Sequence, residues 1–147
     1  MIYIASDHAG YHLKKDLLEY LIKKLELQVE DLGPTQYDEK DDFVDFAAAL
    51  AKKTADDPNN RGILLCSSGH GMCIAANKIK GIRAIIGYSI SGVELGRQHN
   101  DANVLCLAAR TLSKDHAEAI TKKFLDTQFK DEEKYIRRIE KISALEY

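Results

Sequence analysis

The sequence contains no tryptophan, only two prolines and no long uninterrupted apolar run. A helix that crosses a bilayer needs roughly 20 predominantly apolar residues, so we expect no membrane-spanning helix. The opening residues, MIYIASDHAG, also lack the basic segment and the long apolar segment of a secretory signal. We therefore expect a cytoplasmic protein without a membrane partner.

Positive charge is not in excess either. The formal net charge is -2, which provides no overall field to attract nucleic acid, so any basic site must be local. The three cysteines, Cys66, Cys73 and Cys106, are odd in number, and their spacing matches neither a disulfide framework nor a zinc site. We expect free thiols, no metal and no nucleic-acid partner.

What the sequence does contain is the pattern of one α/β domain. A chain of 147 residues is long enough to bury its own core, and no repeat or linker divides it, so residues 1–147 are predicted to form one domain. Short runs rich in isoleucine, valine and leucine alternate with longer stretches of helical period, as in β-α-β units. The runs are residues 2–5, 27–29, 63–66, 83–87 and 103–107.

Helical periodicity is strongest over residues 13–25, where leucine and isoleucine recur every three or four positions. Similar spacing predicts helices over residues 46–51 and 117–124, the latter capped by Ser113. The charged stretch 130–142 keeps one apolar edge and is typical of a solvent-exposed helix. We predict a three-layer α/β/α sandwich, Rossmann-like, with a five-stranded parallel sheet.

Polar and reactive side chains follow three of the predicted strands. Asp7 and His8 follow the first, the segment CSSGHG at residues 66–71 follows the third, and Arg110 follows the fifth. In open parallel sheets, ligands bind at the carboxyl ends of the strands, where loops lead into helix N-termini. We therefore expect an acid, a base, a thiol and a guanidinium on one edge of the sheet.

Residues 66–71 carry the most chemical information. A thiol at a strand end and a helix start lies in positive potential, which favours the thiolate of Cys66. Gly69 and Gly71 would let backbone amides approach an oxyanion or a phosphate. The segment is not a dinucleotide fingerprint, because Ile74 stands where a third glycine is required, and it lacks the lysine of a P-loop. A buried, unreactive thiol remains the alternative for Cys66.

The run SGHGMCIAANKIKGIRA, from Ser68 to Ala84, resembles the signature of the ribose-5-phosphate isomerase B family, which includes galactose-6-phosphate isomerase subunits. Three other segments agree: ASDHAG at 5–10, RQHNDANV at 97–104 and RRIE at 137–140. The resemblance covers essentially the whole chain in order. It implies an aldose–ketose isomerase that interconverts ribose 5-phosphate and ribulose 5-phosphate through a cis-enediol, without cofactor or metal.

The resemblance also implies roles for individual residues. Cys66 matches the base that moves the proton between C1 and C2, His99 matches the group that opens the sugar ring, and the amide of Ser68 would stabilise the enediolate. One branch of the family uses a glutamate where Met72 stands, so Cys66 is the only base on offer here. The implied substrate-binding residues are Asp7, His8, Ser67, Gly69, Gly71, Asn100, Arg110, Lys134 and Arg138.

Several positions depart from the family pattern, and the family's Gly-Gly-Arg-His is replaced by residues 132–135, EEKY. Ser67 replaces a glycine, His70 stands where a small or apolar residue is common, Lys134 replaces an arginine, and Phe43 replaces a tyrosine. Lysine keeps the positive charge of arginine without its bidentate geometry. These changes leave two alternatives open, an isomerase for a six-carbon sugar phosphate such as galactose 6-phosphate or allose 6-phosphate, and a non-catalytic sugar-phosphate-binding module. The role of His70 is left open.

The order of elements predicts an oligomer. His99 precedes the fifth strand and so lies near the amino ends of the strands, whereas Cys66 lies at a carboxyl end. Because a five-residue strand spans roughly 16 Å, one subunit should not bring both side chains to one sugar. We predict a homodimer or a dimer of dimers, as the family resemblance also implies, with sites at the subunit interface.

Overall fold

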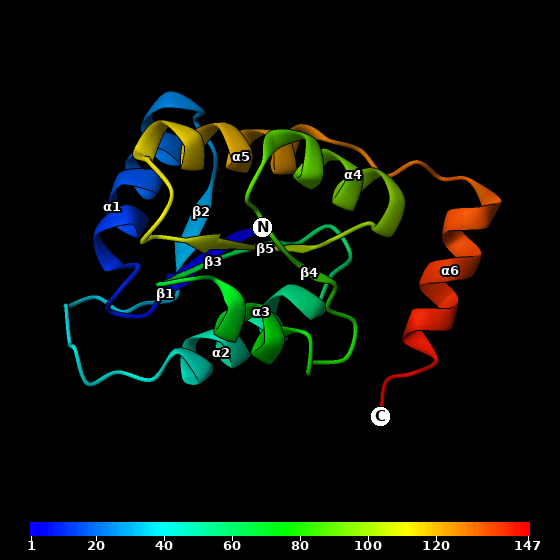
Figure 1. The fold of residues 1–147 in the computed structure, drawn as a ribbon, viewed down its shortest axis with the longest axis horizontal. Coiled ribbons are helices and arrows are strands. Elements are labelled where there is room, and N and C mark those ends of the chain that lie inside the picture. Colours follow the sequence, from blue (N-terminus) through cyan, green and yellow to red (C-terminus); the bar gives the residue numbers. More distant parts are fainter.

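Five parallel strands form a single sheet in the order β2-β1-β3-β5-β4 in the computed structural model, which describes residues 1–147 (Figure 1). The strands are β1 (Ile2–Ser6), β2 (Val29–Asp31), β3 (Arg61–Cys66), β4 (Ala84–Ile86) and β5 (Val104–Ala108). The predicted five-stranded parallel sheet is confirmed. Strand β2 begins two residues later than predicted, because the Leu27 amide bonds to the Leu21 carbonyl and so closes the preceding helix.

Helices cover both faces of the sheet, which confirms the three-layer sandwich. They are α1 (Tyr11–Glu19), η1 (Tyr20–Lys24), α2 (Phe43–Ala55), α3 (His70–Ala76), α4 (Ile90–Asn100), α5 (Lys114–Asp126) and α6 (Glu133–Ser143). Helices α1, α4 and α5 lie on one face, and α2 and α3 lie on the other (Figure 1). The predicted helix over 13–25 is α1 continued by the π-helical turn η1, and Ser113 caps α5 as predicted. No helix combines the length and the apolar character that a membrane span demands.

Alternation along β3 divides the core into two layers. Ile63 and Leu65 pack with the cluster under α1, α4 and α5, whereas Leu64 and Cys66 pack with the cluster against α2 and α3. This alternation follows from the two-residue period of a strand, whose successive side chains point to opposite faces. The side chain of Cys66 therefore faces the α2 and α3 layer.

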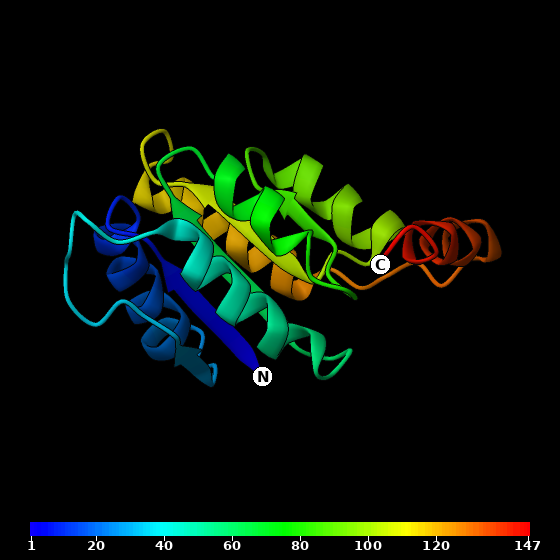
Figure 2. The same ribbon diagram turned by 90° about the horizontal axis from the view of Figure 1, so that it is seen from below.

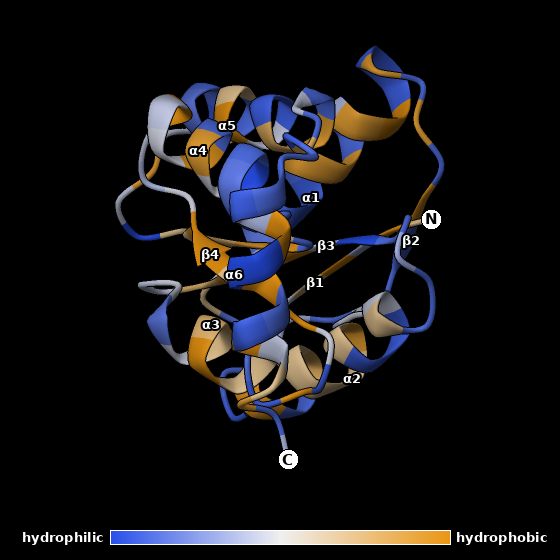
Figure 3. Ribbon diagram, turned by 90° about the vertical axis from the view of Figure 1, so that its right-hand side faces the viewer, coloured by the Kyte–Doolittle hydropathy of each residue, from blue (hydrophilic) through white to orange (hydrophobic).

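Helix α6 stands apart from both helix layers, beside the β4 edge of the sheet (Figures 2 and 3). Its buried residue, Tyr135, stacks on the ring of His99 in α4, with ring centroids 4.5 Å apart. Three large aliphatic side chains of this C-terminal segment are exposed: Ile136, Ile142 and Leu145. The helix thus touches its own chain along only part of its apolar side.

A buried lysine fixes the loop after β2. The side chain of Lys14 is 1% exposed, and its Nζ donates to Asp31 Oδ1 at 2.9 Å and to the Pro34 carbonyl at 2.7 Å. Asp31 Oδ1 also accepts a hydrogen bond from the Gly33 amide at 2.9 Å. These bonds hold the start of the loop 32–42 against α1.

Replacing Lys14 by methionine should lower the free energy of unfolding by about 2–4 kcal/mol, because it leaves a carboxylate and a carbonyl without their cation. Asp31 stays one-third exposed, so water replaces part of the lost interaction. Lys23→Met is the matched control, since its pair with Glu19 is exposed and should change the free energy by less than about 0.5 kcal/mol. Urea unfolding measures both, and equal midpoints for the two variants would contradict the anchoring role of Lys14.

Candidate active site

The carboxyl ends of β1 and β3 form a topological switch point. The two strands are neighbours in the sheet, yet the chain leaves β1 into α1 on one face and leaves β3 into α3 on the other (Figure 1). In open α/β sheets the ligand-binding crevice lies at such a divergence. Asp7 and His8 follow β1, and Cys66 ends β3, so the predicted site residues lie where this crevice is expected.

Main-chain contacts fix the spacing between these two loops. The Asp7 amide donates to the Leu65 carbonyl at 3.1 Å. A Cβ atom at Gly10 would lie 2.5 Å from the same carbonyl oxygen, so only glycine allows α1 to begin this close to β3. Gly10, in the motif at 5–10, therefore allows the backbones of the two loops to approach closely.

The loop after β5 is joined to the same edge. The Ala109 amide donates to the Cys66 carbonyl at 2.8 Å, and the Arg110 amide donates to the Ser67 carbonyl at 3.1 Å. The Arg110 side chain is exposed beside them. The structure thus brings one set of predicted residues to a single edge, as the sequence predicts, and we call it the Cys66 group. Its members are Asp7, His8, Cys66, Ser67, Ser68, Gly69, Gly71 and Arg110.

The Cys66 thiol is enclosed by the turn that follows it. The residue is 5% exposed, and its Sγ accepts a hydrogen bond from the Gly69 amide at 3.2 Å. Gly69 adopts the left-handed conformation, with φ of 80°, which turns its amide back toward the sulfur without steric cost. The left-handed backbone conformation therefore explains why a glycine stands at position 69.

The predicted electrostatics of the thiol is wrong in sign. Burial raises the pKa of Cys66 above its ordinary value, and the amides of Met72, Gly69 and Ser68 lower it by a smaller amount. The nearby charge of Asp7 raises this pKa further. The helix start does favour the thiolate, but removal of the sulfur from water outweighs that effect.

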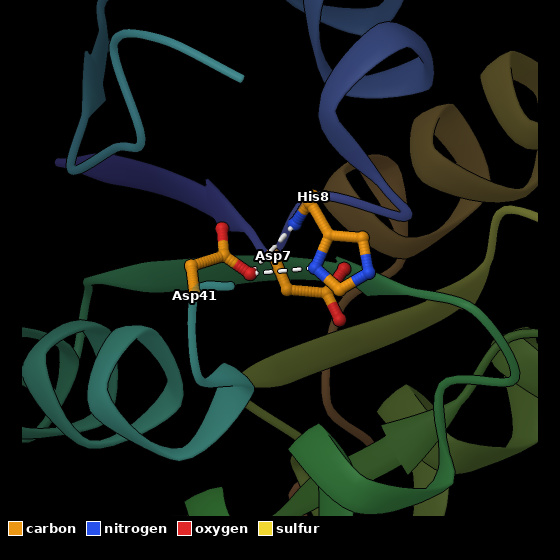
Figure 4. A group of neighbouring side chains, drawn as sticks. All are labelled: Asp7, His8 and Asp41. Atoms are coloured by element: carbon orange, nitrogen blue, oxygen red, sulfur yellow. Dashed lines mark hydrogen bonds and ion pairs between the residues drawn. The ribbon is translucent and has the colours of Figure 1, made fainter. Parts of the chain in front are cut away.

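The acid and the base that follow β1 lie at the same edge of the sheet as the thiol. Asp7 is buried, and its Oδ1 accepts a hydrogen bond from the Gly10 amide at 3.1 Å. Burial raises the pKa of Asp7, and the Gly10 amide opposes that shift. His8 keeps 34% of its side chain exposed, and its Nδ1 lies 2.7 Å from Asp41 Oδ1 (Figure 4). This hydrogen bond is the main cause that raises the pKa of His8.

Asp41 is a site residue that the sequence does not single out. It lies in the acid-rich run DEKDD at 38–42, where no spacing separates one carboxylate from its neighbours. Ligand atoms of Asp7, His8 and Asp41 lie within 4.8 Å of one another, as metal ligands would. The short bond between His8 and Asp41 already engages two of these atoms, so we describe the cluster as a hydrogen-bonded pair beside a carboxyl group.

A second set of predicted residues lies at the opposite edge of the sheet. His99 and Asn100 end α4, just before β5 begins, and the ring of His99 is half-buried against Tyr135 of α6. Lys134 and Arg138 are exposed one turn apart on α6. We call these four residues, His99, Asn100, Lys134 and Arg138, the His99 group. Within one chain, the structure does not bring the His99 group to Cys66.

Comparison with known proteins defines the relationship of the chain. Residues 2–142 match the model of the family described as Ribose/Galactose Isomerase. The chain belongs to this family. It is 45% identical over 145 residues to the probable ribose-5-phosphate isomerase B of Mycoplasma pneumoniae, a match that covers 99% of this chain and 94% of the relative. The family predicted from four sequence segments is confirmed.

Solved structures of isomerases from this family have the same fold. The crystal structure of ribose-5-phosphate isomerase B from Mycoplasma genitalium with bound ribulose-5-phosphate has a TM-score of 0.92 and 42% identity, and the match covers 97% of this chain and 93% of that one. The ribose 5-phosphate isomerase from Thermotoga maritima has a TM-score of 0.92 and 39% identity, covering 98% and 97%. The likeness to these isomerases therefore extends over almost the entire length of this family member.

Proposed function

We propose that this isomerase-family chain interconverts ribose 5-phosphate and ribulose 5-phosphate. The observation that carries the proposal is the Cys66 thiol at the switch point, with the Gly69 amide 3.2 Å from its sulfur and Asp7 beside it. A relative 42% identical over nearly the same length has been solved with bound ribulose-5-phosphate. The three free cysteines fit a reducing cytoplasm, where we infer that the enzyme works.

Proton transfer is the central chemical step of this proposal. The Cys66 thiolate removes the proton from C2 of the open-chain aldose and returns it to C1, through an enediolate. The raised pKa of the thiol makes the thiolate a stronger base once it forms, at the expense of the fraction ionised at neutral pH. Amides in the first turn of α3, which have no partner within the helix, are suited to stabilise the enediolate oxygen.

Substrate anchoring falls to the charged residues around the crevice. The Arg110 guanidinium and the His8 ring are exposed at the same edge as Cys66 and are suited to bind the phosphate. Asp7, whose second carboxyl oxygen is not engaged by Gly10, is placed to contact sugar hydroxyls. Phosphate binding at one end would hold C1 and C2 in a fixed position relative to the sulfur.

We infer that the active enzyme is a homodimer or a dimer of dimers, in which the His99 group completes the Cys66 group of the partner. Within one chain the two groups occupy opposite edges of the sheet. A two-fold axis places the same surface of each chain against the other, so one pairing would complete two sites. The exposed Ile136, Ile142 and Leu145 supply apolar surface that such a pairing would bury.

Incubation with ribose 5-phosphate in deuterated water tests the proposed reaction. We expect deuterium at C2 of recovered ribose 5-phosphate, because solvent exchanges with the proton carried by Cys66. We also expect the highest kcat/KM for ribose 5-phosphate in a panel with galactose 6-phosphate and allose 6-phosphate, and incubation without protein is the control. Binding without exchange would indicate a non-catalytic module. Faster turnover of a hexose phosphate would identify that sugar as the substrate and leave the proposed type of reaction unchanged.

A further inference from the structure

Asp41 contacts His8 at two atoms. One carboxyl oxygen, Oδ1, accepts a hydrogen bond from the His8 backbone amide at 3.1 Å and lies 2.7 Å from the ring atom Nδ1 (Figure 4). The Asp41 side chain is only 8% exposed, although it belongs to a loop in which residues 35–40 are exposed. A carboxylate of this loop has thus been taken out of water to contact one imidazole.

The other oxygen of Asp41 argues against a purely structural role. Oδ2 is buried and has no hydrogen-bond partner. A buried, unpaired carboxylate oxygen costs folding free energy, because its lost hydration is not replaced. An aspartate at position 41 therefore lowers the stability of the fold through Oδ2. Its presence is explained if its negative charge stabilises the cationic form of His8.

The hydrogen bond also determines which nitrogen of His8 is left free for a ligand. An ionised carboxylate accepts but does not donate, so Nδ1 must carry the proton in the bond to Asp41. The remaining nitrogen, Nε2, then points away from Asp41 (Figure 4). When the ring is cationic, Nε2 also carries a proton and can donate to an anion.

We propose that Asp41 is a positioning residue that orients the His8 ring and favours its cationic form through the bond to Nδ1, so that Nε2–H binds the substrate phosphate. The inference rests on the proposed function, in which His8 is a phosphate ligand. Asp41 contacts His8 and not the substrate, so its effect on binding is transmitted through the ring.

The other groups around His8 act in the same direction but less strongly. Asp7 from the β1–α1 loop and Glu39 from the loop after β2 both raise the pKa of His8 through their charges, after the hydrogen bond of Asp41. The ring of Tyr37 lies edge-on at 6.2 Å between centroids. Glu39 forms no hydrogen bond with His8. Its substitution therefore serves as a matched control, because it removes a nearby negative charge without removing a contact to the ring.

The experiment compares Asp41→Asn with Glu39→Gln in the full-length enzyme. The introduced asparagine keeps the shape and an acceptor oxygen but removes the charge, so KM for ribose 5-phosphate at pH 7.5 should rise by about tenfold, which corresponds to about 1.4 kcal/mol of lost phosphate binding. The value of kcat should stay within about twofold, because binding is lost rather than proton transfer. The difference in KM between the two variants should shrink as the pH is lowered from 7.5 to 5.5, because acid favours the cationic form of His8 in both.

Ring ¹⁵N chemical shifts supply a readout that does not depend on turnover. In the wild-type enzyme at alkaline pH, the neutral His8 should carry its proton on Nδ1, and in Asp41→Asn the pKa of His8 should fall. Added inorganic phosphate should shift Nε2 and leave Nδ1 in place. A neutral His8 protonated on Nε2, or equal KM and His8 pKa in the two variants, would overturn the inference.

The two proposals fail in different ways. A wild-type enzyme that does not convert ribose 5-phosphate contradicts the proposed function, whereas the His8 titration with inorganic phosphate still decides the role of Asp41. Thermal melting of Asp41→Asn separates the positioning role from a structural one. We expect a melting temperature within about 3 °C of that of Glu39→Gln, because the lost ion pair with His8 is partly offset by removal of a buried charge whose Oδ2 has no hydrogen-bond partner. A large fall accompanied by unchanged His8 titration would overturn the proposal.

Discussion

Replacing Cys66 by alanine should lower kcat for ribose 5-phosphate by about 10³-fold, within the range that a single general acid–base contributes. The reason is that the substitution removes the group that we propose to carry the proton between C2 and C1. No carboxylate stands at position 72, where a branch of the family places its base, and we assign the Asp7 carboxyl to the sugar hydroxyls rather than to proton transfer. Steady-state kinetics measures the loss, and deuterium exchange at C2 should fall in parallel.

The control for this prediction is Cys73→Ala. Cys73 lies in α3 and is half-buried, and its sulfur contacts the Ala84 carbonyl at 3.5 Å rather than the crevice. Both variants remove one sulfur atom from a partly or fully packed site, so each should lose only about 1 kcal/mol of unfolding free energy. Activity should therefore separate the two variants while stability does not. A Cys66→Ala enzyme that retains a tenth of the wild-type kcat would remove the thiol from the mechanism.

Mixing two inactive variants should restore activity. A Cys66→Ala chain keeps an intact His99 group, and a His99→Asn chain keeps an intact Cys66 group. If the site is shared between subunits, each mixed dimer holds one intact site and one doubly altered site. Because random pairing makes half of the dimers mixed, the mixture should regain about a quarter of wild-type activity. The experiment requires subunit exchange, which differently tagged chains make measurable.

A mixture of Cys66→Ala and Cys66→Ser chains is the matched control, since no pairing of these two variants produces an intact site. Activity recovered only in the first mixture would support a site built from two chains. If the first mixture stays as inactive as its parents after complete exchange, His99 and Cys66 must act within one chain. A fully active monomer in sedimentation would lead to the same conclusion.

The sheet and the Cys66 group could be predicted because their signals are local. Short apolar runs bounded by turns define buried strands, and the residues that follow parallel strands meet on one edge whatever their distance in sequence. Asp7, Cys66 and Arg110 can be found in this way. The boundary of β2 cannot, because Leu27 completes the strand-like apolar pattern while its amide closes a helix.

The sign of the thiol pKa shift and the role of Asp41 could not be predicted, because both depend on burial. A helix start can be recognised in sequence, but the depth of Cys66, which is 5% exposed, cannot, and depth determines which effect on its pKa is larger. Asp41 is one of four acids within residues 38–42, and only the path of the loop brings it to His8. The anchor that sets the start of this path, Lys14, looks in sequence like any other lysine of an amphipathic helix.

The contact between Gly10 and the Leu65 carbonyl has a consequence for how this protein can evolve. Because the two loops touch through main-chain atoms, the distance between their backbones is set by a hydrogen bond and by van der Waals contact at Gly10. Leucine, isoleucine and valine can then replace one another beneath the sheet while the backbones that carry Asp7 and Cys66 keep their separation. The spacing of these two backbones is thereby insulated from drift in the core.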